Sequence, residues 1–155
     1  MNKMKKYLLC ILGMLSALVS ITSCQEANEI EKLYLTRCWQ LSSVYGTAAD
    51  VNLFVDFDED GEFVICQLTD GYTYAVFKGT YTTTVDGDKS VLSGVYDDGT
   101  PWVSDYTYVV DSARRELVLE SVDSPSVTSV YVPAEMPDYT TRGAGFASAN
   151  IVKPL

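Results

Sequence analysis

Apolar and polar residues alternate with a period of two from Thr36 to Pro133, and clusters of turn-forming residues interrupt the alternation about every 8 to 14 residues. Val, Thr, Tyr and Phe dominate the segments between these clusters. Such a pattern is typical of short antiparallel strands joined by tight turns. The strands are predicted at residues 36–45, 51–57, 62–68, 72–85, 90–97, 102–110, 116–122 and 127–132.

Sequential strands with short connections predict an all-β fold, a small eight-stranded antiparallel up-and-down barrel. A meander of about eight strands closes with room for its own side chains or for one small ligand. The fourth predicted strand is the longest and contains Gly79, which predicts a bend or bulge there. The barrel is therefore expected to form one domain over residues 36–133.

The alternation also predicts which side chains point into the barrel. Asp105 and Thr107 should face water, which turns the residues of opposite parity inward. The candidate ligand-binding residues chosen in this way are the aromatic residues Trp39, Tyr74, Tyr81, Trp102, Tyr106, Tyr108 and Tyr131. The aliphatic residues expected beside them are Leu41, Val76, Val85, Val110, Leu117 and Leu119. These side chains either line a site for a flat apolar or amphipathic molecule or fill a closed core.

The N-terminal segment has the pattern of an export signal. Lys3, Lys5 and Lys6 precede an apolar run from Leu8 to Ile21 that is too short to span a bilayer. The motif Ile-Thr-Ser-Cys that ends at Cys24 resembles the lipobox of bacterial lipoproteins, in which the cysteine is lipidated and becomes the mature N-terminus. This resemblance implies a signal peptide over 1–23 and lipidation of Cys24. A polar tether over 24–35 and a C-terminal tail over 134–155, expected to be flexible, flank the barrel.

Charge and composition exclude several classes of function. Without the three lysines of the signal, eight basic residues face 21 acidic ones, a net charge of −13. Such a chain repels phosphate backbones, so no nucleic-acid partner is expected, and attachment to a membrane would depend on the lipid. The chain has no histidine, and its paired acids flank glycines in predicted turns. We therefore expect no enzyme activity, no catalytic residues and no cofactor.

The segment Asp56–Phe63, DFDEDGEF, begins like a calcium-binding loop. An EF-hand requires helices on both sides and a glutamate at its twelfth position, but the flanks alternate with a period of two and that position is Gln67. The segment is therefore predicted to be a β-hairpin whose turn comprises residues 58–61, with no metal site. A weak calcium site of the millimolar kind is the alternative.

Two cysteines, Cys38 and Cys66, remain after the signal and the lipidated cysteine are set aside. An exported protein favours a disulfide. A meander, however, places one strand between the strands that carry them, a separation of about two spacings of 4.8 Å. That exceeds the limit of about 7 Å between the Cα atoms of a disulfide, so two free thiols are predicted.

Several of these motifs together resemble the small lipocalin-like domains of lipoproteins from Gram-negative gut bacteria. Trp39 corresponds to the inward Trp of the first strand, Phe57, Gly61 and Phe63 to the second hairpin, and Gly79 with Tyr81 to a later Gly-x-Tyr strand. The Gly that usually stands two residues before the Trp is replaced by Arg37.

The resemblance implies an outer-membrane lipoprotein, facing the periplasm or displayed on the cell surface, that binds a small hydrophobic or amphipathic ligand. The alternative is a non-enzymatic interaction or inhibitor module that recognises a protein partner and uses the barrel only as a scaffold.

Overall fold

The computed structural model describes residues 34–69, 73–140, 145–146 and 153–155. The chain divides into two units, Met1–Lys32 and Leu33–Leu155, of which the first lies outside the described residues. Within the described ranges, no helix is long and apolar enough to cross a bilayer.

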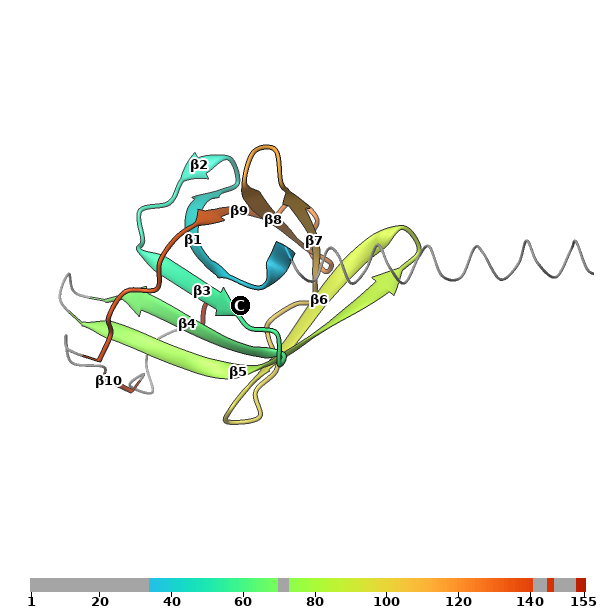
Figure 1. Ribbon diagram of the computed structural model, residues 1–155. Helices are drawn as coiled ribbons and strands as arrows, with labels where there is room; N and C mark the ends of the chain where they lie inside the picture. The colour runs from blue at the N-terminus through green and yellow to red at the C-terminus, as the bar shows by residue number, and fades with distance from the viewer. Residues whose placement is uncertain (1–33, 70–72, 141–144, 147–152) are drawn as a thin grey trace, which may run out of the picture. The chain divides into compact units, whose positions relative to one another are not determined.

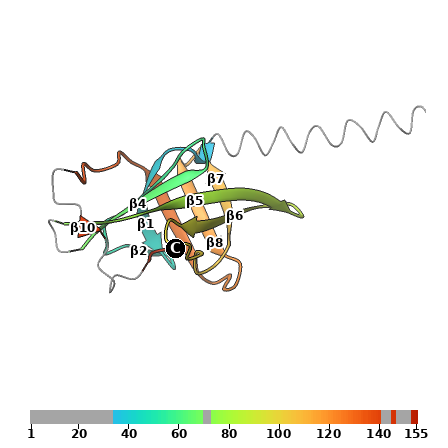
Figure 2. The same ribbon diagram turned by 90° about the horizontal axis from the view of Figure 1, so that it is seen from below.

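The second unit is a closed antiparallel barrel (Figures 1 and 2). Its strands are β1 (Cys38–Val44), β3 (Leu53–Phe57), β4 (Glu62–Leu68), β5 (Tyr74–Asp86), β6 (Lys89–Tyr96), β7 (Tyr106–Asp111), β8 (Glu116–Ser121) and β9 (Thr128–Pro133). Each strand pairs with the next in this series, and pairing of β1 with β9 closes the barrel. The predicted eight-stranded up-and-down barrel is therefore confirmed.

Two short strands were not predicted. The strand β2 (Thr47–Ala48) folds back on β1, and β10 (Gly145–Phe146) pairs in parallel with Ala75 and Val76 of β5. β10 occupies the edge of β5 that β6 leaves free, because β6 pairs with β5 only from Gly79 onward. The chain after β9 therefore returns to the barrel wall.

The barrel has two distinct ends, because the connections between antiparallel strands fall alternately at one end and at the other. Short turns at 58–61, 87–88 and 112–115 define the hairpin end. The connections from β1 to β3, β4 to β5, β6 to β7 and β8 to β9 define the loop end, and the segment 97–105 is one of them.

The strand expected at 102–110 begins only at Tyr106. Pro101 has no N–H to donate to a ladder, and the segment instead folds back on β6, where the Trp102 N–H donates to the Gly94 carbonyl at 2.9 Å. The prediction for this strand was therefore too long at its start. Trp102 is carried by a loop and not by a strand.

The inward parity predicted for the long fourth strand was wrong in part. Ile65 of β4 lies opposite Phe77 of β5, so odd-numbered residues of β5 point inward and Val76 is only half-buried. Val85 has inward parity but is 52% exposed, because the far part of the β5–β6 hairpin extends beyond the other strands (Figure 1). The sequence is apolar at both parities from Tyr74 to Phe77, which made the alternation ambiguous.

Candidate functional site

The barrel interior is built from large side chains of each of the eight barrel strands. β3 and β8 show the alternation most clearly, with buried residues at every second position. The aromatic members of this core cluster are Trp39, Phe57, Phe63, Phe77, Tyr81, Tyr96, Trp102, Tyr106, Tyr108 and Tyr131. This buried aromatic core is the candidate site, because its rings provide apolar surface and its hydroxyls provide polar contacts.

Polar contacts with the backbone close the core at the hairpin end. Trp39 Nε1 donates to the Leu35 carbonyl at 2.9 Å, and the Leu35 side chain is fully buried. Tyr81 donates its hydroxyl to the Asp58 carbonyl at 2.5 Å. Burial, with a smaller effect of the Asp58 charge, raises the pKa of Tyr81 to about 12, so its hydroxyl keeps its proton at neutral pH.

The turn at the hairpin end confirms the predicted hairpin for 58–61. The Asp58 carboxylate accepts the Glu62 N–H at 2.8 Å, and Gly61 adopts a φ of 87°, which favours glycine. The Asp58 side chain therefore takes part in the turn itself. Within the described ranges, no three His, Cys, Asp or Glu side chains gather in a way that could hold a metal ion.

Trp102 contacts three other aromatic rings of the core. Its ring contacts Phe63 and Tyr106 at centroid distances of 5.2 and 6.1 Å, and it covers Gly94, where a Cβ atom would lie only 2.2 Å from the indole. The indole Nε1 is buried, and no described residue offers it a hydrogen-bond acceptor. A buried donor without an acceptor costs about 1–3 kcal/mol, which makes this N–H a candidate contact for a ligand acceptor.

Besides Tyr81, three tyrosines of the core have raised pKa values, namely Tyr96, Tyr106 and Tyr131. Burial raises the pKa of Tyr106 and of Tyr131, and for Tyr131 the neighbouring Tyr106 and Tyr96 add to the effect. Burial raises the pKa of Tyr96 to about 12, although its hydrogen bond with Leu155 acts in the opposite direction. These hydroxyls are therefore neutral and able both to donate and to accept.

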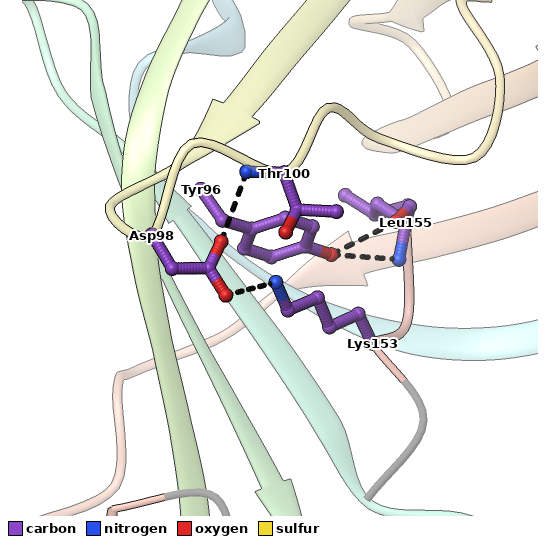
Figure 3. Close-up of polar contacts among 5 residues, drawn as sticks. All are labelled: Tyr96, Asp98, Thr100, Lys153 and Leu155. Atoms are coloured by element: carbon purple, nitrogen blue, oxygen red, sulfur yellow. Dashed lines mark hydrogen bonds and ion pairs between the residues drawn. The ribbon is translucent and has the colours of Figure 1, made fainter. Parts of the chain in front are cut away.

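The segment Lys153–Leu155 reaches this core at Tyr96 (Figure 3). The Tyr96 hydroxyl donates to the Leu155 carbonyl at 2.9 Å and accepts the Leu155 N–H at 3.1 Å, while the Leu155 side chain joins the core cluster. Lys153 Nζ lies 2.6 Å from Asp98 Oδ2 and 4.6 Å from the centroid of the Tyr96 ring. The hydrogen bond from Lys153, together with the Thr100 N–H, lowers the pKa of Asp98 to about 2.

Six of the seven candidate residues come together in the core cluster, namely Trp39, Tyr81, Trp102, Tyr106, Tyr108 and Tyr131. Tyr74 is only 7% exposed but does not belong to this cluster, because its parity on β5 is that of the outer face. Leu117 and Leu119 are buried as predicted, and Leu41 and Val110 pack partly against the core.

Sequence reasoning missed Phe77, Tyr96 and Leu155. Tyr96 shares parity with the apolar Leu92 on β6, which could have identified it. Nothing in the pattern around Leu155 signals that it enters the core. Cys24 and the tether up to Leu33 lie outside the described residues, as do Ile151 and Val152 of the tail.

Both Cys38 and Cys66 are free thiols, as predicted. They lie on β1 and β4 with β3 between them, where Cys38 is opposite Asp56 and Cys66 is opposite Phe54. Burial raises the pKa of Cys38 to about 12 and that of Cys66 to about 11. Neither is an activated nucleophile of the low-pKa kind.

No family model matches the sequence, and no curated protein matches it. The closed barrel is compatible with a lipocalin-like fold, and this agreement is one of architecture alone.

Proposed function

We propose that this protein is a lipid-anchored, lipocalin-like binding protein of the cell envelope that holds a small hydrophobic or amphipathic ligand inside its barrel. The proposed anchor is a lipid on Cys24, at the periplasmic face of the outer membrane or on the cell surface. The proposal assigns the barrel no catalytic role and no cofactor, in line with the absence of histidine from the sequence.

The observation that best supports a ligand is the unpaired indole of Trp102. Buried donors in proteins nearly always have an acceptor, so one without a partner calls for a specific explanation. A ligand with a carbonyl, ether or hydroxyl oxygen would supply this acceptor while its apolar part contacts the rings of Phe57, Phe63 and Tyr106. The proposed ligand-contacting set is Trp39, Tyr81, Trp102, Tyr106, Tyr108 and Tyr131, without Tyr74.

The second candidate is an interaction or inhibitor module whose barrel is only a scaffold. Two observations favour it. The core side chains are large and nearly all inaccessible to solvent, and the outer surface exposes apolar residues, of which Val103 is 82% and Val109 is 63% exposed. Exposed apolar surface is suited to a protein partner when it is contiguous.

A titration with 1-aminoanthracene, a flat apolar dye whose emission rises in a dry environment, separates the two candidates. A ligand-binding barrel should give a saturable one-to-one signal that weakens at least several-fold in Trp102→Phe, which removes the indole N–H and keeps an aromatic ring. Val103→Ser, at an exposed position, is the matched control and should leave binding unchanged. Absence of saturable binding to the folded wild-type chain would favour the scaffold role.

A further inference from the structure

The segment Lys153–Leu155 contacts the barrel in the way that an amphipathic ligand would. Its aliphatic side chain, Leu155, is 4% exposed and belongs to the core cluster. Its peptide N–H and carbonyl both bond to one hydroxyl, that of Tyr96. Its cation, Lys153, lies outside the core between the Asp98 carboxylate and the face of the Tyr96 ring (Figure 3).

These contacts lie at the loop end of the barrel. Tyr96 is the last residue of β6, and Asp98 lies in the connection that follows it, which belongs to the loop end by topology. The hairpin end is closed by Leu35, whose carbonyl accepts from Trp39 only four residues away. Tyr96 and Leu155, in contrast, are separated by 59 residues along the chain.

The polar contacts of the segment can be exchanged for those of another molecule. The Asp98 side chain is 60% exposed, and exposed ion pairs contribute little to stability. The Tyr96 hydroxyl can donate and accept with any partner that presents a comparable pair of polar atoms. A cation over an aromatic ring and beside a carboxylate is likewise a contact that any ammonium group can make.

We propose that Lys153–Leu155 is a built-in occupant of the ligand site, and that an aliphatic amine, with its chain in the place of Leu155 and its ammonium at Asp98 and Tyr96, displaces it. This inference rests on the proposed ligand-binding function and adds an ammonium group to the ligand, at a position separate from the oxygen that would accept from Trp102. Where an occupant of the same chain fills the site in about nine molecules of ten, the apparent affinity for the ligand falls by about tenfold.

The test uses octylamine and octanoate, which share chain length and differ in charge, with the full chain and two charge-matched variants. Lys153→Gln weakens the occupant and should raise the affinity for octylamine by about three- to tenfold. Lys89→Gln, at an exposed position on the β5–β6 hairpin, changes the net charge equally and should have no effect. Equal affinities in the two variants would overturn the inference.

The ammonium site is tested in the Lys153→Gln background, where the tail no longer competes for Asp98. Adding Asp98→Asn should weaken octylamine binding by about three- to tenfold and leave octanoate binding unchanged or stronger. An equal loss for both ligands would show that Asp98 does not contact the ammonium, and would overturn the assignment of ligand class.

Hydrogen exchange at the Leu155 amide distinguishes failure of this inference from failure of the proposed function. That amide donates to Tyr96, so its exchange should be slow in the free protein and faster by about tenfold or more at saturating octylamine. Binding of octylamine without faster exchange would overturn the displacement and leave the ligand-binding function intact. No saturable binding of either amphiphile would count against the proposed function itself, and the inference would fall with it.

Discussion

Replacing Gly94 with alanine tests how the core is assembled around Trp102. A Cβ atom at this position would lie 2.2 Å from Trp102 Cε2 and 2.5 Å from Cζ2. Contacts between carbon atoms are optimal at about 3.5–4.0 Å, so the indole would have to move by more than about 1 Å. The indole is hindered in such a movement by the rings of Phe63 and Tyr106.

The expected cost follows from two opposing effects. Overpacking of a well-filled core costs about 1–3 kcal/mol. Replacement of glycine by alanine also restricts the unfolded chain, which returns about 0.4–1 kcal/mol. At the middle of both ranges, the net destabilisation of Gly94→Ala should be about 1.3 kcal/mol, equivalent to a decrease in Tm of roughly 5–10 °C for a domain of this size.

A double-mutant cycle with Trp102→Ala makes this prediction specific. Trp102→Ala alone should cost about 3–5 kcal/mol, as large-to-small core substitutions do. In that background Gly94→Ala no longer meets an indole, so its effect should fall to near zero or become stabilising. Unfolding in urea followed by far-ultraviolet circular dichroism gives all four free energies. If the two substitutions are additive within about 0.5 kcal/mol, the indole does not pack on Gly94.

Three further predictions concern pH, the thiols and the anchor. The hydrogen bond from Lys153 lowers the pKa of Asp98 from 3.8 to about 2 in the folded protein, so their contact should be present above about pH 4 and be lost as pH falls through about 2. An NMR titration of the Asp98 carboxyl measures this pKa, and Lys153→Gln should return it towards 3.8. Cys38 and Cys66 should both react with a thiol reagent in the unreduced, denatured chain. In the native protein at pH 8 both should react far more slowly, because their pKa values are raised to about 12 and about 11. If no thiol reacts after denaturation, the two cysteines form a disulfide. Cys24→Ser should block processing as a lipoprotein without unfolding the barrel, and mass spectrometry of the native N-terminus should find a lipidated cysteine; an unmodified cysteine would contradict the proposed anchor.

The architecture was predictable because one signal is repeated along the whole domain. The alternation of β3, β7 and β8 places residues such as Val55, Tyr108 and Leu117 on the inner face, and each is buried. Turn residues give the boundaries, and Gly61 with its positive φ is an example. Strand pairing then follows from short connections, because neighbouring strands in sequence pair most readily when little chain separates them.

The predicted inward residues were wrong where the apolar pattern fits either face of a strand. Tyr74 and Val76 carry the same kind of apolar side chain as Ala75 and Phe77, so alternation cannot decide which pair points inward. The decision comes from pairing with β4, where Ile65 lies opposite Phe77. Likewise Val85 has the inward parity, but it lies beyond Thr80, the last residue of β5 that pairs with β4, so no strand covers it on that side.

Long-range contacts left no local signal, and they bear most directly on function. The Leu35 contact at the hairpin end is local, so little chain entropy opposes its re-formation. The Leu155 contact at the loop end must be re-formed by a segment distant in sequence, and its polar contacts are one hydroxyl and one exposed ion pair. Closure at the loop end should therefore open more readily than closure at the hairpin end. A ligand that reaches Trp102 is accordingly expected to enter past Tyr96, in competition with the tail of the chain itself.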